Sequence, residues 1–163
     1  MPASALTCYD AFDSAAGGNV QSTLLLGRQH NSIDGGGHGE GDHNDEPSSL
    51  GSWPYSQGVV LDGWMWTSGQ VALDPTTGSM VGADAASQAD QALRNIDAIL
   101  KTAGSSLAKV VHTTVFLTNM DDFSAVNEVY ARYFPNAFPA RSCVEVSRLP
   151  LGALVEIDAV AKI

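Results

Sequence analysis

The stretch that decides the fold runs from residue 109 to residue 147, KVVHTTVFL-TNM-DDFSAVNEVYARYF-PNAFPA-RSCVEVS. Lys109–Leu117 is rich in valine, threonine and phenylalanine, which favour β-strands. Asp121 or Asp122 can cap a helix that continues to about Phe134, with an inner side formed by Phe123, Val126 or Asn127, Tyr130 and Phe134. A second strand is expected at Arg141–Ser147. The stretch therefore predicts two roughly parallel strands joined by a helical crossover.

The residues before this stretch add a hairpin. Tyr55–Leu61 and Trp64–Ser68 are two short β-type runs. Asp62-Gly63 joins them, and this dipeptide is a strong signal for a two-residue hairpin turn. The two runs are therefore expected to pair as antiparallel strands.

A further helix and a final strand complete the pattern. Asp84 can cap a helix that runs to about Ala103, and Gly104 can end it at the C′ position. Its apolar stripe would consist of Ala86, Ala89, Leu93, Ile96 and Leu100. Ala153–Ala161 is the last predicted strand. The order ββ(β)αβαββ predicts an α+β fold in which one mixed sheet carries two helices on a single face.

Alternation along the last two strands indicates where a site would lie. Val155, Ile157, Ala159 and Ala161 form a wholly apolar face that should pack on the helices, opposite Leu154, Glu156, Asp158 and Val160. In Arg141–Ser147 the residues Arg141, Cys143 and Glu145 share one face, opposite Ser142, Val144 and Val146. We expect Arg141 and Cys143 to lie with Glu156 and Asp158 on the face away from the helices. Such a polar face would be wet or covered by another subunit, and a site would lie there.

The first part of the chain has a different composition. Residues 1–46 contain seven acids and one base, so this part carries a formal charge of −6 out of −10 for the whole chain of 163 residues. Residues 1–47 are therefore expected to form an acidic, Gly/His-rich flexible extension, with a short element possible around Val20–Leu26. Residues 48–163 would form the folded domain. The spacing of His30, His38 and His43 matches no closed zinc site, so no metal is expected.

Charge and hydropathy exclude several classes of protein. No basic stripe is present that could neutralise phosphates, so sequence-independent nucleic-acid binding is disfavoured. No apolar run approaches the ~18 residues of a membrane span. Cys8 and Cys143 lie far apart with no secretory signal, which favours reduced thiols. These features predict a soluble, cytoplasmic protein.

Several motifs together resemble the Rid family of reactive-intermediate deaminases, also called YjgF/YER057c/UK114. They are YSQ at 55–57, TSGQ at 67–70, TTVFL at 113–117, Val126-Asn127 with Tyr130, PARSCVEV at 139–146 and VEI at 155–157. The resemblance covers about residues 50–163 and implies a chorismate-mutase-like fold in a homotrimeric barrel with a site at each subunit interface. It also implies hydrolysis of 2-imino or enamine acids, without metal or cofactor, to 2-oxo acids and ammonia.

The resemblance assigns roles residue by residue. It makes Arg141 the group that binds the substrate carboxylate and Glu156 the group that activates water. The substrate-binding positions that it implies are Arg141, Tyr55, Gly69, Cys143 and Asn127, with backbone groups acting at Gly69 and Cys143. In one departure, this chain has Gly51-Ser52-Trp53-Pro54-Tyr55 where the family has Gly-Pro-Tyr, which bears on substrate range more than on reaction type.

Each of these residues has a plainer alternative. Arg141 could pair with a carboxylate at a subunit contact, and Glu156 could be a solvated partner of an arginine. Asp158 is interpreted as structural, and Cys143 as a buried, inert thiol because no histidine lies in a recognisable relay. Tyr55 could be a core or interface aromatic, and Asn127 a helix–strand contact.

Alternative functions also stay open. One is a non-catalytic binder of small carboxylates, which would keep Arg141 and not need Glu156. Another is a pathway-specific relative that acts on one unusual unstable intermediate. The third is an endoribonuclease or translation inhibitor, against which the acidic charge argues.

Overall fold

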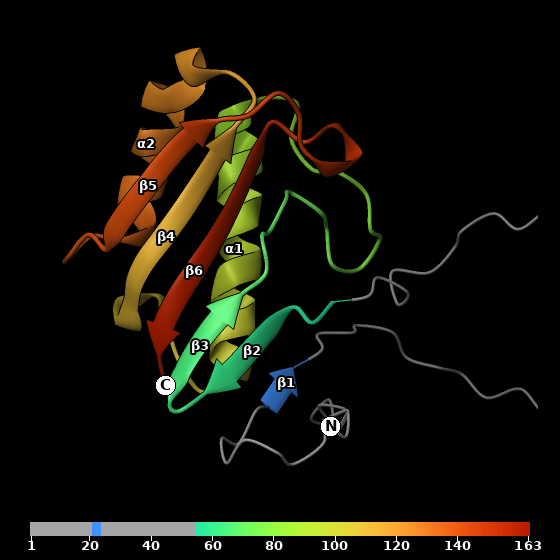
Figure 1. Cartoon of the computed structure of the whole chain (residues 1–163). Coiled ribbons are helices and arrows are strands. Elements are labelled where there is room, and N and C mark those ends of the chain that lie inside the picture. The colour runs from blue at the N-terminus through green and yellow to red at the C-terminus, as the bar shows by residue number, and fades with distance from the viewer. Residues whose placement is uncertain (1–20, 24–54) are drawn as a thin grey trace, which may run out of the picture.

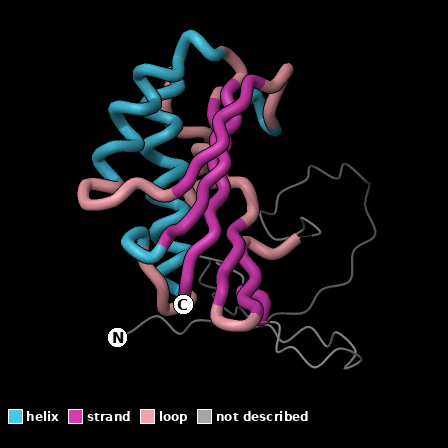
Figure 2. Tube along the Cα trace, turned by 60° about the vertical axis from the view of Figure 1, so that its left-hand side comes forward, coloured by secondary structure: helices cyan, strands magenta, loops and turns pink. Residues whose placement is uncertain are grey.

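A computed structural model of the protein describes residues 21–23 and 55–163 as a mixed six-stranded sheet, in the order β1-β2-β3-β6-β4-β5, with two helices against one face (Figures 1 and 2). The predicted α+β fold is confirmed. The strands are β1 (Gln21–Thr23), β2 (Gly58–Leu61), β3 (Trp64–Thr67), β4 (Val110–Leu117), β5 (Ala140–Glu145) and β6 (Val155–Lys162), and the helices are α1 (Ala85–Thr102) and α2 (Phe123–Tyr133). Neither helix is long and apolar enough to cross a membrane.

Local signals placed the hairpin and the first helix correctly. Leu61 pairs with Trp64, and Asp62 and Gly63 both have positive φ, at 51° and 74°, as a two-residue turn of this kind requires. The Asp84 side chain accepts a hydrogen bond of 2.8 Å from the Ser87 amide at the start of α1. Gly104, with φ of 78°, follows its end.

The strand–helix–strand unit is also confirmed, because β4 and β5 pair in parallel and α2 connects them. The start of α2 differs from the prediction. Asp122 is at the N-cap but makes no capping hydrogen bond. Asn119 instead accepts a bond of 3.0 Å from the Asp121 amide, because a 3-10 turn at Met120–Asp122 precedes the helix.

β1 pairs antiparallel with β2 and forms one edge of the sheet. It lies within the segment that was expected to be an extension, at the place where a short element around Val20–Leu26 was possible. The remainder of residues 1–47 lies outside the described residues, as do the three histidines His30, His38 and His43. In the described part, no group of three or more His, Cys, Asp or Glu residues is arranged to hold a metal ion.

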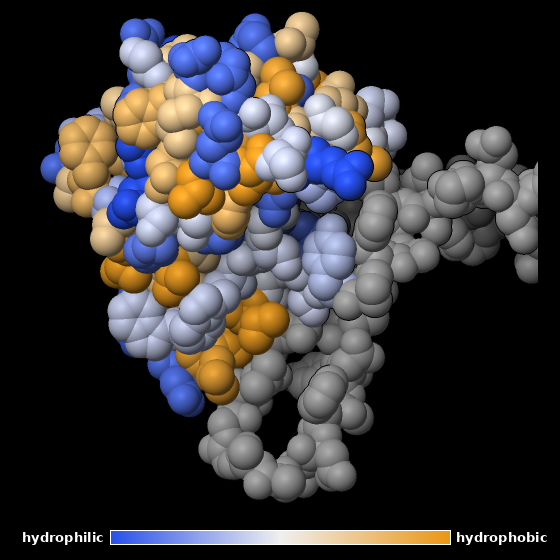
Figure 3. All heavy atoms as spheres, turned by 45° about the horizontal axis from the view of Figure 1, so that its top comes forward, coloured by the Kyte–Doolittle hydropathy of each residue, from blue (hydrophilic) through white to orange (hydrophobic). Residues whose placement is uncertain are grey.

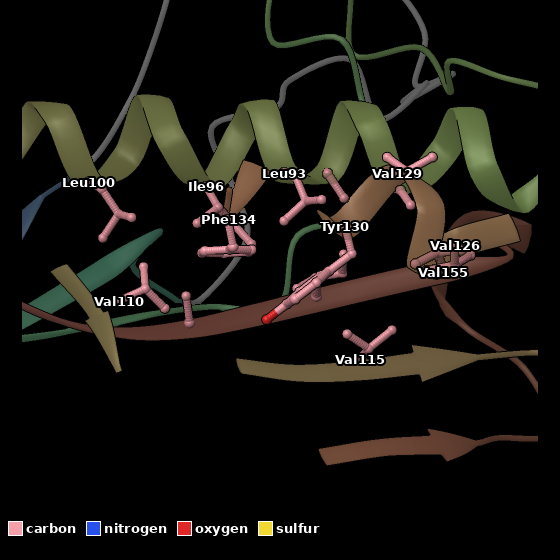
Figure 4. Close-up of a cluster of buried hydrophobic side chains, with 14 of the residues drawn as sticks. Leu93, Ile96, Leu100, Val110, Val115, Val126, Val129, Tyr130, Phe134 and Val155 are labelled. Carbon is pink, nitrogen blue, oxygen red and sulfur yellow. The ribbon is translucent and has the colours of Figure 1, made fainter. Parts of the chain in front are cut away.

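The core fills the space between the sheet and the two helices (Figure 4). The apolar face expected for β6 is confirmed, because its members are at most 1% exposed: Val155, Ile157, Ala159 and Ala161. On α2, Val126 and Tyr130 are buried as expected. Phe123, however, is 37% exposed because it lies at the first turn of α2, at the margin of the core.

One hydrogen bond crosses this core. Thr113 of β4 is 0% exposed and Tyr130 of α2 is 3% exposed, and their hydroxyl oxygens are 2.7 Å apart. Figure 4 shows the Tyr130 hydroxyl directed from α2 toward the sheet. Each hydroxyl therefore depends on the other for its hydrogen bond.

We expect Thr113→Val and Tyr130→Phe each to lower the free energy of unfolding by about 1–3 kcal/mol, because each leaves one buried hydroxyl unpaired. The double variant should recover most of that loss, since neither hydroxyl remains. Urea denaturation of the four proteins measures the coupling. Strictly additive losses in the double variant would contradict the assigned pair.

Candidate active site

Arg141 lies near the start of β5 and reaches toward α2. Its guanidinium carbon is 4.7 Å from the centre of the Tyr130 ring and 5.5 Å from the centre of the Phe123 ring. Both contacts are within cation–π range. Arg141 therefore lies on the side of the sheet that carries the helices.

This placement corrects the expectation that Arg141 and Cys143 lie on the face away from the helices. Arg141 pairs with Thr113 and Cys143 with Val115, and both of those β4 residues are fully buried toward the helices. Val144 points the other way and is 42% exposed. The reason is that β5 is an edge strand, where α2 covers only the margin, so a long polar side chain can lie against helix residues and still reach solvent.

The guanidinium of Arg141 has no carboxylate partner in the described part of the chain. Its planar face lies over aromatic rings, so its N–H edges remain available for hydrogen bonds. A planar carboxylate suits this fork because it can accept two parallel N–H bonds. The site can therefore bind an anion with defined geometry.

Two more predicted residues accompany Arg141. Cys143 follows on the same face of β5, and its thiol has a raised pKa because of burial, which the Arg141 charge partly opposes. A raised pKa disfavours the reactive thiolate, in agreement with the interpretation of an inert thiol. Asn127 is half-buried on α2, four residues after Phe123 and three before Tyr130, so it lies on the same side of the helix as the two rings.

Glu156 and Gly69 form a second group. The Gly69 backbone lies directly against the Glu156 carboxylate, and a β-carbon at Gly69 would overlap the oxygen Oε1 and lie 2.7 Å from the carboxyl carbon. The adjacent backbone pair holds this arrangement, because the Gln70 amide donates to the Ile157 carbonyl at 2.8 Å and the Ile157 amide to the Gln70 carbonyl at 3.0 Å. Glycine is needed here for close approach to Glu156.

The Glu156 carboxyl has a raised pKa, first because it is partly buried and second because Asp158 is negatively charged nearby. A raised pKa makes a carboxylate a better proton acceptor. Asp158 accepts a hydrogen bond of 3.1 Å from the Thr114 amide of β4, and this contact supports its structural interpretation. Glu156 is thus the group in this cluster suited to proton transfer.

Tyr55 immediately precedes Ser56 and Gln57, which are hydrogen-bonded to the residues on either side of Gly69. The Ser68 hydroxyl donates to the Ser56 carbonyl at 2.6 Å, and the Gln70 side-chain amide donates to the Gln57 side-chain oxygen at 3.0 Å. This polar network was not predicted. Ser52 and Trp53 lie outside the described residues.

The sheet separates the two groups within one chain. Ile157 is buried toward the helices, so its neighbour Glu156 points to the opposite face, whereas Arg141 is on the helix side. One copy therefore does not bring Arg141 and Glu156 to a common substrate. The sequence alone missed this, and it also missed Phe123 and Tyr130 as ring partners of Arg141.

The face of the sheet opposite the helices is partly apolar. Trp66 of β3 and Val144 of β5 point to this face and are 44% and 42% exposed. Figure 3 shows apolar side chains at the surface among hydrophilic ones. Exposed apolar sheet surface is typical of a region that contacts another protein.

Gly69→Ala tests the contact with Glu156. The added methyl group would displace a flexible carboxylate and no rigid backbone, so the protein should still fold with a melting temperature close to that of the wild type. The carboxylate would shift from its position, and a displacement of about 1 Å can cost on the order of 100-fold in rate. Steady-state kinetics with a thermal melt measure both effects. Wild-type turnover in a folded Gly69→Ala variant would exclude a catalytic need for this contact.

Comparisons with known proteins identify the family to which the chain belongs. The sequence model of the endoribonuclease L-PSP family matches residues 45–163. The human protein 2-iminobutanoate/2-iminopropanoate deaminase is 46% identical over 115 residues, which cover 71% of this chain and 82% of the relative.

Two solved Escherichia coli structures also match the fold. TdcF with bound serine is 42% identical, has a TM-score of 0.65, and the match covers 68% of this chain and 89% of TdcF. The YjgF gene product is 44% identical with a TM-score of 0.65, covering 71% and 91% of the two chains. The chain therefore belongs to the endoribonuclease L-PSP family, which is the Rid (YjgF) family that its motifs resemble.

Proposed function

We propose that the protein hydrolyses 2-imino acids and their enamine tautomers to 2-oxo acids and ammonia, without a cofactor. The observation that carries this proposal is a guanidinium that is stacked on two rings and lacks a carboxylate partner in the described part of the chain. A substrate carboxylate supplies the missing anion. The similarity to a human imine deaminase supports the reaction type.

The reaction needs one water molecule and two proton transfers. Glu156 accepts a proton from water as the water oxygen forms a bond to the imine carbon, and the C=N bond becomes a C–N single bond. This first proton passes to nitrogen, which gives an intermediate with a hydroxyl and an amino group on the same carbon. The hydroxyl then gives up the second proton of the water, which also passes to nitrogen, and the C–N bond breaks to release ammonia as the C=O bond forms. Arg141 fixes the substrate carboxylate so that the imine carbon faces the water. Backbone groups at Gly69 and Cys143, with Tyr55 and Asn127, line the proposed pocket.

The site is assembled between copies of the chain in this proposal. Arg141 and Glu156 lie on opposite sides of the sheet, so the arginine of one copy meets the glutamate of its neighbour. Each copy then contributes Arg141 to one site and Glu156 to another, as in a closed ring with repeated interfaces. A homotrimer is the assembly that the family resemblance implies, and the partly apolar face opposite the helices would be covered in it.

The activity is tested by following ammonia release from imines that an amino-acid oxidase generates in situ. These imines also hydrolyse unaided, so the control is the same mixture without the protein. We expect ammonia release to accelerate in proportion to the protein concentration. No acceleration with any 2-imino acid of small side chain would refute the proposal.

A non-catalytic binder of small carboxylates is the second candidate. It is favoured by the solved E. coli relative that holds serine, which is itself a small carboxylate. A binder would need Arg141 and not Glu156. The two candidates therefore differ in whether the wild type, besides binding a carboxylate, shows turnover that Glu156→Gln lowers.

A further inference from the structure

The two rings that contact Arg141 come from one side of one helix. Phe123 and Tyr130 are seven residues apart in α2, which is close to two helical turns. Their rings lie 5.5 Å and 4.7 Å from the guanidinium carbon of Arg141. We call this pair the aromatic bracket. The guanidinium is thus in contact with two rings on a single rigid element.

The Tyr130 ring is itself fixed from two directions. Its hydroxyl is 2.7 Å from the Thr113 hydroxyl, and its ring centre is 4.6 Å from that of Phe134. Thr113 is also the β4 residue that pairs with Arg141. Thr113 therefore pairs with Arg141 across the sheet and also hydrogen-bonds to the tyrosine whose ring contacts the Arg141 guanidinium.

Phe123 is fixed through the same strand that carries Arg141. The Glu145 carboxylate, four residues after Arg141 on β5, accepts a hydrogen bond of 2.7 Å from the Met120 amide. Met120 begins the 3-10 turn that leads into α2 at Phe123. β5 thus sets the position of the arginine and also that of the helix start that presents Phe123.

We propose that the aromatic bracket positions the Arg141 guanidinium for a carboxylate, with Phe123 and Tyr130 acting as positioning residues and not as catalytic residues. An arginine side chain loses rotamer freedom when it binds a ligand. The bracket restricts that freedom before the ligand arrives, and such preorganisation raises affinity. This inference rests on the proposed function, because it assumes that Arg141 binds a carboxylate.

Plain core packing is the competing explanation, and it differs between the two rings. Tyr130 is buried and contributes to the core in any case. Phe123 is 37% exposed, so the core loses little when its ring is removed. Phe123 is therefore the residue at which positioning can be separated from stability.

The experiment compares Phe123→Leu with the matched control Phe138→Leu. Phe138 is 70% exposed and makes no cation–π contact with Arg141 among the described residues. The probe is pyruvate, a simple 2-oxo carboxylate, with binding measured by titration calorimetry. Phe123→Leu should weaken pyruvate binding by about 2- to 5-fold, the loss expected for one partly exposed cation–π contact. Phe138→Leu should bind pyruvate as the wild type does.

Two further measurements test whether the Phe123 ring affects binding through Arg141. In an Arg141→Lys background, adding Phe123→Leu should change pyruvate binding much less than in the wild type, because the group that the ring positions is gone. In deamination assays, Phe123→Leu should raise KM for imino acids and leave neutral imines unaffected.

The outcomes separate this inference from the proposed function. Weaker pyruvate binding by Phe123→Leu would support the bracket even if the wild type showed no deaminase activity. Wild-type binding by Phe123→Leu would overturn the bracket even if the wild type is an active deaminase. An equal loss of binding in the Phe138→Leu control would also overturn it, because the effect would then be unspecific.

Discussion

Arg141→Lys is expected to remove most of the activity on imino acids, although the positive charge remains. Lysine offers a point charge on a flexible stem and cannot form two parallel hydrogen bonds to a carboxylate. It also lacks the flat guanidinium face that lies 4.7 Å from the centre of the Tyr130 ring. Arg141→Ala should cost more, about 2–4 kcal/mol in transition-state stabilisation, by analogy with the loss of one partner of a charged hydrogen-bonded pair.

A neutral imine that lacks a carboxylate is the matched control substrate. Its hydrolysis should change little in either variant, because it offers nothing for the guanidinium to bind. The measurement is kcat/KM for both substrate types, with the assembly state checked by sedimentation. Full activity of Arg141→Lys on imino acids would show that Arg141 does not bind the carboxylate.

Glu156→Gln is expected to lower turnover by about 100-fold or more, the range seen when a general acid or base is removed. Glutamine keeps the size of glutamate and can still form hydrogen bonds, but it cannot accept a proton from water. Pyruvate should still bind, because Arg141 is unchanged. Unchanged turnover would assign water activation to another group, whereas a catalytically inactive wild type that binds pyruvate would favour the non-catalytic binder.

The pH dependence follows from the environment of Glu156. Burial, and secondly the charge of Asp158, raise the pKa of this carboxyl above its ordinary value of 4.5. Only the ionised form can accept a proton, so kcat/KM should fall as the pH decreases through a pKa higher than 4.5. Asp158→Asn removes the nearby charge and should therefore shift the acidic limb of the pH–rate profile toward lower pH. A pH–rate profile that is identical in Asp158→Asn would contradict this account.

The fold was largely predictable because its signals are local. Asp62-Gly63 fixes a turn through two positive φ angles, and Asp84 caps α1 through a neighbouring amide. The apolar alternation of β6 identified the side that packs on the helices. Such features depend on residues close in sequence, so they can be recognised without knowing the tertiary contacts.

The orientation of β5 was not predictable in the same way. Alternation along the strand placed Arg141 on the face away from the helices, opposite Val144, and the structure has the reverse orientation. The edge position of β5 decides this, since a polar residue there can lie on aromatic rings at the margin of the core. The aromatic spacing at Phe123 and Tyr130 was visible in the sequence as a helical stripe. The contact between these two rings and an arginine of the following strand depends on the tertiary structure, so the stripe alone did not predict it.

The central claim is that Arg141 of one copy acts with Glu156 of another. It is tested most directly by mixing Arg141→Ala and Glu156→Gln chains, after unfolding and refolding them together in equal amounts. Each variant alone should be nearly inactive. Averaged over all rings formed from the mixture, about one quarter of the interfaces join an intact arginine to an intact glutamate, because each interface draws its two neighbours independently. We predict recovery of roughly that fraction of wild-type activity. No recovery in rings shown to contain both chains would contradict a site shared between copies.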